Sequence, residues 1–458
     1  MLFKKVLNFI NSPTFSSWLN MASKGAALLL ITPVIYKTLH SEDVLNWLLL
    51  LNLMSFLLIL DFGLLPNTIR ILSRKIGESK LKNNFKKPQK VLQSIIETKK
   101  LYTYLSFLVF FIFLVLIIVF FLFNNEYKIG LALVSVLVVF SGCVAIFNNY
   151  YISVLHSYLK VAKVQRSIAI INLFTLLIAC LFLIFFKSLL ITVMVYVSNH
   201  FIISIYLRYL FKIEFVGINF TNIERTNVKI IKSEIFNSSW KTGIGVLFSM
   251  GLISLSGFIS PILFSATLSA QYLFYIQFIR YISSFSQPPF YSEIPLYNRM
   301  FGEGNINKLN KILFKRFNFS LIVYLFLAIT VSLVLPVLIN LFEYKKTVLI
   351  NELWFFLILG FYIERIVSML VQILTISSYI IWHWFNFIIG ISAILFFVTS
   401  INISNPKIIL FSHTIIFSYG LIGLPIISYL IIKKTKLELV KLIFPHLFLI
   451  LLFILTRL

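Results

Sequence analysis

Five charged side chains lie inside long apolar runs of the sequence, where an ionisable group is rare and costly. They are Lys24, Asp61, Arg280, Glu364 and Arg365. A charge at the centre of a bilayer carries a penalty of a few kcal/mol on insertion scales, so it usually faces a partner or a water-filled cavity. Fixed cations there can bind an anion such as phosphate, and carboxylates can take up a proton or coordinate an ion. These residues are therefore candidates for a translocation site.

Some of the five candidates are explained by a role that has no part in transport, and others are not. Asp61 stands near one end of its run, so it can extend to water, as can Lys241 at the start of a later run. Lys24 and Arg280 lie near the middle of theirs and are harder to dismiss. Because Glu364 and Arg365 are adjacent, they point about 100° apart on a helix, and we expect their partners on other helices or across a turn.

Further polar side chains accompany these charges in the apolar runs. They are Asn148, Asn149, Asn199, His200, Gln277, His383, Asn386 and His413. Together they suggest a hydrated path, whereas each one alone is better explained by a hydrogen bond between helices.

The composition identifies the bilayer as the solvent for most of the surface. The chain has 458 residues, of which 60% are hydrophobic and 12% are charged, about half the charged fraction of a soluble domain. The net charge of +25 comes mainly from short segments between apolar runs, so membrane topology explains it and we expect no nucleic-acid partner. The two cysteines both lie in apolar runs, and we expect neither a disulfide framework nor a metal site.

Twelve runs of about 20 mostly apolar residues are long enough to cross a bilayer as helices. They cover residues 15–38, 43–65, 101–123, 129–155, 166–186, 188–210, 241–263, 266–290, 317–342, 350–375, 381–402 and 407–432. A shorter run at 442–456 is either a thirteenth span or an interfacial segment. The sequence thus predicts an all-α polytopic membrane protein of about twelve transmembrane helices.

The distribution of Lys and Arg predicts the orientation. Basic residues concentrate in the segments 66–100, 211–240 and 291–316, and again after the twelfth run, while the alternate segments carry few. Short cytoplasmic segments are enriched in Lys and Arg, so these segments and the N-terminus are expected in the cytoplasm. We expect a multi-pass membrane protein, and no segment is long enough for a separate soluble catalytic domain.

A weak internal repeat divides the chain into halves. Ser16-Ser17-Trp18 opens the first run and Ser238-Ser239-Trp240 the seventh, 222 residues later. Arg74-x-x-Gly-Glu78 follows the second run and Arg299-x-x-Gly-Glu303 the eighth, 225 residues later. Both halves begin on the cytoplasmic side, so the repeat is parallel, with its axis along the membrane normal.

The repeat and the segment boundaries predict five regions. They are an amphipathic lead-in at 1–14, an N-terminal lobe of six helices at 15–210, a cytoplasmic linker at 211–240, a C-terminal lobe of six helices at 241–432, and a basic loop with the C-terminal hydrophobic segment at 433–458.

No motif in the sequence indicates an enzyme or a bound cofactor. The chain contains no Walker A sequence, so ATP is not expected as its direct energy source, and it contains no His-Glu-x-x-His or Cys-x-x-Cys motif. The outer segments hold no pair of carboxylates suited to acid–base chemistry. We therefore expect a transporter.

The stretch from Asp61-Phe62-Gly63-Leu64 to Arg70-Ile71-Leu72-Ser73 resembles the end of the second helix in O-antigen (Wzx-type) flippases. There an Asp-x-Gly-Leu stretch leads to an Arg and a Ser. Those flippases are polysaccharide exporters of the multidrug/oligosaccharidyl-lipid/polysaccharide superfamily, and their length, twelve helices and two six-helix halves are also similar. The motif covers about thirteen residues, and the architectural likeness covers nearly the whole chain.

The resemblance implies a substrate and its partners. The substrate would be an undecaprenyl-diphosphate-linked oligosaccharide, flipped from the cytoplasmic to the outer leaflet of a bacterial inner membrane. Polysaccharide polymerase machinery would be a partner. Related lipid II flippases hold the diphosphate with cations of their first, second and eighth helices. Lys24 and Arg280 match two of these helices, whereas the second helix carries Asp61, with Arg70 only beyond its end. For an ion-coupled cycle, Asp61 and Glu364 are the candidates, with Arg365 beside Glu364.

Two other functions stay open at this point. A drug or cation antiporter of the same superfamily should carry carboxylates in its cavity, which Lys24 and Arg280 argue against and Glu364 allows. An integral-membrane O-antigen polymerase or ligase should carry a large outer loop, whereas the predicted outer loops are a few residues long.

Overall fold

The computed structural model describes most of the chain in two compact units, Met1–Ser239 and Trp240–Leu458. The described residues are 9–26, 31–39, 43, 47, 50, 53–54, 57, 60–81, 89–123, 129–216, 234–245, 248, 260, 263, 266–341, 351–377, 379–401 and 409–434. Regular structure in this part of the chain is helical throughout, and no strand occurs in it. The hydrophobic segment at 442–456 lies outside the described residues.

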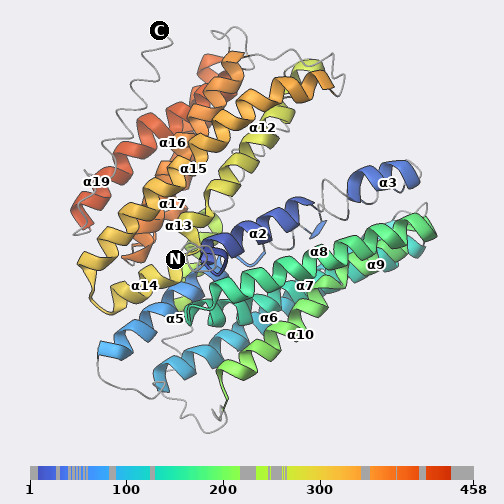
Figure 1. The fold of residues 1–458 in the computed structure, drawn as a ribbon, viewed down its shortest axis with the longest axis horizontal. Helices are drawn as coiled ribbons and strands as arrows, with labels where there is room; N and C mark the ends of the chain where they lie inside the picture. The colour runs from blue at the N-terminus through green and yellow to red at the C-terminus, as the bar shows by residue number, and fades with distance from the viewer. Residues whose placement is uncertain are drawn as a thin grey trace. The chain divides into compact units, whose positions relative to one another are not determined.

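Unit 1 is a bundle of helices in which α7 is central. Its helices are α2 (Pro13–Ala26), α3 (Thr32–Thr38), α5 (Leu64–Leu81), α6 (Gln89–Phe123), α7 (Ile129–Ser157), α8 (Val161–Phe186), α9 (Leu189–Val197) and α10 (Asn199–Glu214). Helix α7 packs against α5, α6, α9 and α10, and α2 packs against α8. Figure 1 shows α6 to α10 running side by side. The end of the segment predicted as a linker, 234–239, is also helical and belongs to this unit.

Unit 2 is organised around α16. Its helices are α12 (Ala266–Ser286), α13 (Pro288–Tyr291), α14 (Ile294–Gly302), α15 (Ile306–Leu341), α16 (Asn351–Ile376), α17 (Trp382–Ser400), α18 (Leu410–Ile415), the π-helical stretch η3 (Ile416–Gly423) and α19 (Leu424–Lys434). Helix α16 packs against α12, α15, α18, η3 and α19.

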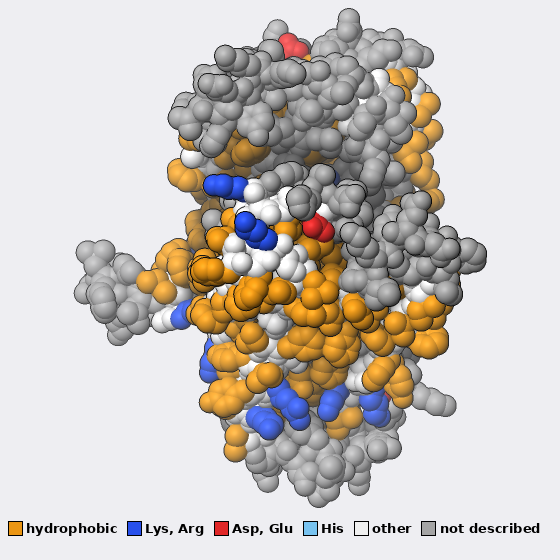
Figure 2. All heavy atoms as spheres, turned by 90° about the vertical axis from the view of Figure 1, so that its right-hand side faces the viewer, with side chains coloured by type: hydrophobic (Ala, Val, Ile, Leu, Met, Phe, Trp, Pro, Cys, Tyr) orange, Lys and Arg blue, Asp and Glu red, His pale blue; other side chains and the backbone are white. Residues whose placement is uncertain are grey.

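Eight helices among the described residues are long and apolar enough to cross a membrane. Many of their large hydrophobic side chains are exposed, such as Phe107 at 70% and Phe185 at 77%. Figure 2 shows hydrophobic side chains over much of one face, with Lys and Arg gathered in a few places. In water such a surface would be a severe liability, so the chain is a multi-pass membrane protein.

Several helices differ in extent from the apolar runs that predicted them. Helix α6 begins at Gln89 and α15 at Ile306, each more than two turns before its apolar run. Hydropathy marks only the part of a helix that lipid can accept, whereas the helix itself continues through polar residues that favour it. Conversely, α12 ends at Ser286 instead of 290, because Pro288 and Pro289 start a new short helix.

Two predicted spans are interrupted helices. The run at 188–210 is formed by α9 and α10, which meet at Ser198. The run at 407–432 contains the π-helical stretch η3 between α18 and α19. A hydropathy profile cannot show either feature. Both change the backbone hydrogen bonds, and neither changes how apolar the side chains of the run are.

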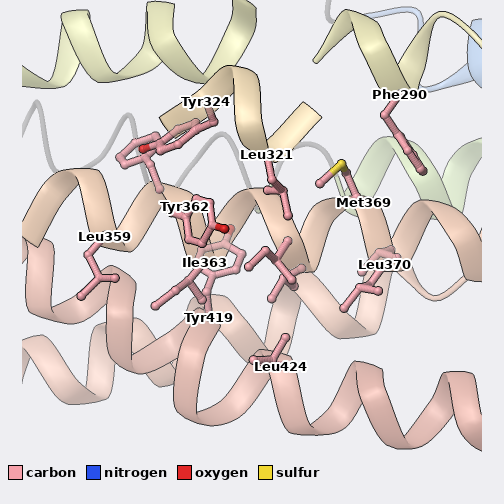
Figure 3. Packing of buried hydrophobic residues seen from close by; sticks show 14 of the residues in the cluster. Phe290, Leu321, Tyr324, Leu359, Tyr362, Ile363, Met369, Leu370, Tyr419 and Leu424 are labelled. Carbon is pink, nitrogen blue, oxygen red and sulfur yellow. The ribbon is translucent and has the colours of Figure 1, made fainter. Parts of the chain in front are cut away.

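Each unit has its own hydrophobic core. In unit 2 it includes Phe290, Tyr324, Met369 and Tyr419, contributed by α13, α15, α16 and η3 (Figure 3). Unit 1 contains two clusters, one around Tyr102 and Ile146 and the other around Trp47, Ala179 and Val193.

Gly245 allows a very close helix contact inside unit 2. A Cβ built on it would lie 2.6 Å from the Cβ of Trp382 and 2.7 Å from that residue's backbone carbon and oxygen. The Asn386 side-chain amide donates to the Gly245 carbonyl at 2.7 Å. The segment that opens the predicted seventh span is thereby fixed against the start of α17.

Candidate functional site

Among the predicted site residues whose side chains the structure describes, Arg365 on α16 is the most buried charge, at 4% exposed. Its Nη2 donates to Ser283 Oγ on α12 and lies 3.5 Å from Glu364 Oε2. With the Gln287 amide oriented to satisfy the network, its oxygen accepts from both terminal guanidinium nitrogens at 3.1 and 3.2 Å. Glu364 and Arg365 thus pair with each other, although they point in different directions on the helix. Arg365 also has partners outside its own helix, as the sequence predicted.

Arg280 lies on the same side of α12 as Ser283, because residues spaced by three along a helix share a face. Arg365 contacts Ser283 and also Gln287, which directly follows the end of α12. These contacts join α16 to the end of α12 at a place that we call the α12–α16 seam. Arg280 is half-buried one turn before Ser283.

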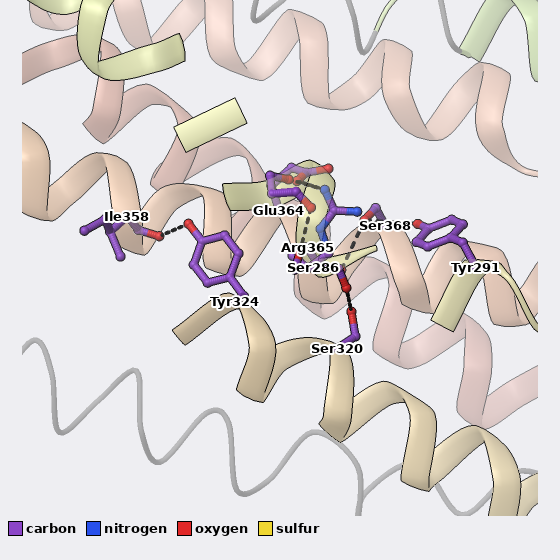
Figure 4. Close-up of polar contacts among 9 residues, drawn as sticks. Ser286, Tyr291, Ser320, Tyr324, Ile358, Glu364, Arg365 and Ser368 are labelled. Carbon is purple, nitrogen blue, oxygen red and sulfur yellow. Dashed lines mark hydrogen bonds and ion pairs between the residues drawn. The ribbon is translucent and has the colours of Figure 1, made fainter. Parts of the chain in front are cut away.

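Hydroxyl groups connect the helices around the α12–α16 seam through hydrogen bonds (Figure 4). The Ser320 hydroxyl of α15 donates to the Ser286 carbonyl at 2.5 Å, where α12 ends. The Tyr324 hydroxyl donates to the Ile358 carbonyl at 2.8 Å, and Tyr291 Oη lies 3.4 Å from Ser368 Oγ. The ionic pair is therefore held in a fixed polar environment inside an otherwise apolar core.

In unit 1, Asp61 occupies the turn that starts α5. Its Oδ2 accepts from the Leu65 backbone N–H at 2.8 Å, the geometry of a helix cap. The next two residues have left-handed backbones, with φ of 47° at Phe62 and 71° at Gly63. Asp61 is 7% exposed. Its position supports a structural role at this turn and leaves a role in ion coupling open.

Arg70 lies in the interior of unit 1, about two and a half turns along α5 from Asp61. It is 7% exposed. Burial lowers its pKa to about 10, Glu234 opposes the shift, and Arg74 adds to it. The guanidinium therefore stays charged at neutral pH. Glu234 also pairs with Lys75 at 3.4 Å, which connects the helical end of the predicted linker to α5.

Lys24 lies on α2, one turn after Asn20. Its side chain is outside the described part of the structure. The Asn20 amide donates to Gln165 Oε1 of α8 at 2.5 Å, which fixes α2 against α8.

The repeated Arg-x-x-Gly-Glu motif forms the same ion pair in each unit. Arg74 Nε lies 2.9 Å from Glu78 Oε1 in α5, and Arg299 Nε lies 3.4 Å from Glu303 Oε1 at the end of α14. Both pairs span four residues of helix. The two halves therefore repeat a local structure as well as a sequence pattern.

Three of the intramembrane amides make hydrogen bonds between helices. The Asn148 amide donates to the His200 carbonyl at 2.9 Å, the Asn199 amide to Asn172 Oδ1 at 3.3 Å, and the Asn386 amide to the Gly245 carbonyl. For these residues the interhelical explanation is sufficient.

Sequence reasoning missed Ser283 and Gln287 as partners of Arg365. Their spacing of four residues, directly before Pro288-Pro289, is the signal that could have identified them, because it places two polar groups on one face at a predictable helix end.

Comparisons with known proteins identify the fold. No protein-family model matches the sequence, and no curated protein matches it. Solved structures match over almost the whole chain. A MATE structure in the straight conformation has a TM-score of 0.72 at 15% identity, covering 93% of this chain and 96% of that one. An outward-facing multidrug resistance MATE family transporter of the MOP superfamily has a TM-score of 0.70 at 12% identity, with 92% and 95% covered.

A third match is a MOP superfamily transporter from Pyrococcus furiosus, described as having a binding pocket of reverse polarity that suggests a different function. Its TM-score is 0.66 at 11% identity, covering 92% of this chain and 95% of that one. These matches confirm the predicted architecture of about twelve helices in two lobes. The chain has the fold of the MATE transporters of the MOP superfamily.

Proposed function

We propose that the protein is a flippase that moves an undecaprenyl-diphosphate-linked oligosaccharide from the cytoplasmic to the outer leaflet of a bacterial inner membrane. The observation that carries the proposal is the charge of the α12–α16 seam. Glu364 is paired with Arg365 at 3.5 Å, and Arg280 stands on α12 one turn before Ser283, a partner of Arg365. Two cationic side chains thus accompany one carboxylate in this part of unit 2, which suits an anionic substrate.

A diphosphate benefits from this arrangement more than most substrates. It is a multivalent anion, and its transfer through a region of low dielectric constant is strongly unfavourable without a fixed countercharge. The polyprenyl tail can remain in lipid while the head group crosses. Rocking of two lobes, as in other transporters built from repeats, would expose the site to each side in turn.

Within this proposal the residues have distinct roles. Lys24 and Arg280 bind the diphosphate, as the resemblance to lipid-linked oligosaccharide flippases implies. Arg365 and Glu364 hold the α12–α16 seam in place, and Asp61 and Glu364 are the carboxylates available for coupling to an ion. Arg70 is buried inside unit 1, so we do not assign it to substrate binding.

A second candidate is an ion-coupled multidrug antiporter. It is favoured by the shared fold with a multidrug resistance MATE family transporter. A MATE-type cavity for cationic drugs would need an excess of carboxylates, whereas Glu364 is accompanied by Arg365 and Arg280 in unit 2. The Pyrococcus furiosus transporter is described as having a pocket of reverse polarity, so the fold is compatible with more than one kind of substrate.

Complementation in cells tests the proposal. The gene is expressed in a strain that lacks its own O-antigen flippase but makes the matching repeat unit, and surface polysaccharide is measured. Wild type should restore it, K24A and R280A should not, and K24R and R280K should retain part of it, because charge is kept while the donor geometry changes. Full export by both alanine variants at normal protein level would contradict the assigned roles.

A further inference from the structure

A narrow apolar slot runs along the outside of unit 1 between three membrane-spanning helices. Its volume is about 540 Å³, within the range of about 300–1,000 Å³ that ligand sites have. Phe107 of α6, Cys143 and Phe147 of α7, and Ile205 of α10 line it. Phe107 and Ile205 are 70% and 73% exposed, so the slot opens toward the surface that faces lipid.

Three aromatic rings close one end of the slot. Phe140 of α7 contacts Phe110 of α6 with ring centroids 5.8 Å apart, and Phe201 of α10 with centroids 5.6 Å apart. This end lies toward the middle of the membrane spans of all three helices. A chain that enters from the other end would therefore stop at Phe140.

The two hydroxyl groups that α6 contributes to the slot need no polar ligand. The Thr103 hydroxyl donates to the Lys99 carbonyl at 2.9 Å, and the Ser106 hydroxyl to the Tyr102 carbonyl at 2.8 Å. Both groups are thus satisfied within α6. The interior of the slot is suited to a hydrocarbon chain.

The open end of the slot carries cations on two helices. Lys99 lies one turn before Thr103 on α6, and Arg208 lies one turn beyond Ser204 on α10, so each shares a face with a lining residue. Because α6 and α10 run in opposite directions relative to the predicted membrane, both cations lie at the cytoplasmic end. Both side chains are exposed, and neither has an ion-pair partner among the described residues. Lys100, in contrast, pairs with Glu97 at 2.8 Å.

We propose that this slot binds an anionic phospholipid of the cytoplasmic leaflet, with one acyl chain between α6, α7 and α10 and its phosphate between Lys99 and Arg208. An apolar interior that is closed at one end and flanked by two cations at the other matches a hydrocarbon chain attached to an anion. The site is independent of the transport proposed above, because all its residues belong to unit 1 and none is assigned to the translocation path.

Binding of phosphatidylglycerol to the purified full-length protein in neutral detergent tests the proposal. K99Q/R208Q should weaken it by about thirtyfold, since each surface cation contributes about a fivefold gain in affinity for an anionic lipid. The matched control is K308Q/K311Q, which removes two exposed cations from α15 and should leave binding unchanged. Phosphatidylcholine should bind much more weakly than phosphatidylglycerol to the wild type.

Filling the slot provides a second, independent test. C143F places a ring in the slot and should abolish phosphatidylglycerol binding, whereas C180F changes the only other cysteine, on α8, and should not. K99Q/R208Q changes only exposed side chains and leaves the core unchanged. Its affinity for phosphatidylglycerol therefore decides the test if C143F is unstable. Equal binding of phosphatidylglycerol by K99Q/R208Q and wild type would overturn the proposal. So would binding of a polyprenyl phosphate without binding of phosphatidylglycerol, which would assign the slot to the tail of the transport substrate.

Discussion

Arg365 illustrates what a buried charge requires of its neighbours. The guanidinium is withdrawn from water and compensated by Glu364, by the Ser283 hydroxyl and by the Gln287 amide. Taking a charge out of water is unfavourable, and such a group persists only where other atoms replace its hydration. The sequence identified the two charges because they interrupt an apolar run. The spacing of Ser283 and Gln287 marks two polar groups at a helix end, but it could not show that Arg365 is their partner, because the register between α12 and α16 depends on packing that no local pattern encodes.

Removal of Arg365 should therefore destabilise the protein strongly. R365A leaves a carboxylate, a hydroxyl and an amide without their partner, and we expect a loss of about 3 kcal/mol, near the lower end for a broken buried ion pair since Glu364 is partly accessible. E364Q/R365M, which removes both charges and keeps similar volumes, should recover most of that loss. Thermal unfolding in detergent measures both. A fully stable R365A would show that the pair is not part of the packed core.

The helix-capping contact of Asp61 and its proposed role in ion coupling can be separated by substitution. D61A removes the oxygen that accepts from the Leu65 N–H and should lower stability by about 1 kcal/mol, as expected for a lost helix cap. D61N retains a cap of similar strength and should keep wild-type stability. If D61N is stable but inactive in export, the charge is needed for transport. If D61A has wild-type stability, the residue does not function as a cap.

At the level of the elements, the close contact at Gly245 is the most specific packing requirement in unit 2. G245A would place a methyl group within 2.7 Å of the backbone of Trp382, so α17 would have to move, and we expect a loss of about 1–3 kcal/mol. G390A provides the matched control, because a Cβ on that buried glycine of α17 would meet no atom within 4 Å. Equal thermal stability of the two variants would contradict the described contact.

The elements also show which parts of the fold the sequence could predict. Apolar runs located the eight candidate spans in the described part of the chain, because a span must be apolar over most of its length. They could not give the ends of α6 and α15, since polar residues extend a helix beyond the membrane without any change in backbone geometry. Nor could they reveal the π-helical stretch η3, because it changes the backbone hydrogen bonds and leaves the run apolar.

At the level of the whole molecule, the predicted orientation can be tested directly. In a variant without native cysteines, a cysteine at Lys163 or Lys308 should resist a membrane-impermeant maleimide in intact cells and react after permeabilisation. A cysteine at Lys187 should react in both conditions, since it lies at the other end of α8. All three positions are exposed, so burial cannot mimic protection. Labelling of Lys163 or Lys308 in intact cells would reverse the topology.

The sequence predicts the internal repeat only at short motifs whose residues contact each other within one helix. Its motifs were visible because the ion pairs Arg74–Glu78 and Arg299–Glu303 require fixed residues four positions apart. Most of the two halves share no detectable sequence, because many apolar side chains can fill equivalent positions in a membrane bundle. For the same reason the matched transporters share the fold at only 11–15% identity.

Transport by the purified protein in liposomes tests the central claim most directly. A fluorescent polyprenyl-diphosphate oligosaccharide is incorporated into both leaflets, and an impermeant reductant quenches the molecules on the outside. The account predicts that the reductant reaches nearly the whole pool with wild-type protein and about half of it with R280A, in which flipping is lost. A fluorescent cationic drug should not be transported. Transport of the drug, with no flipping of the lipid-linked oligosaccharide, would contradict the account and establish the antiporter.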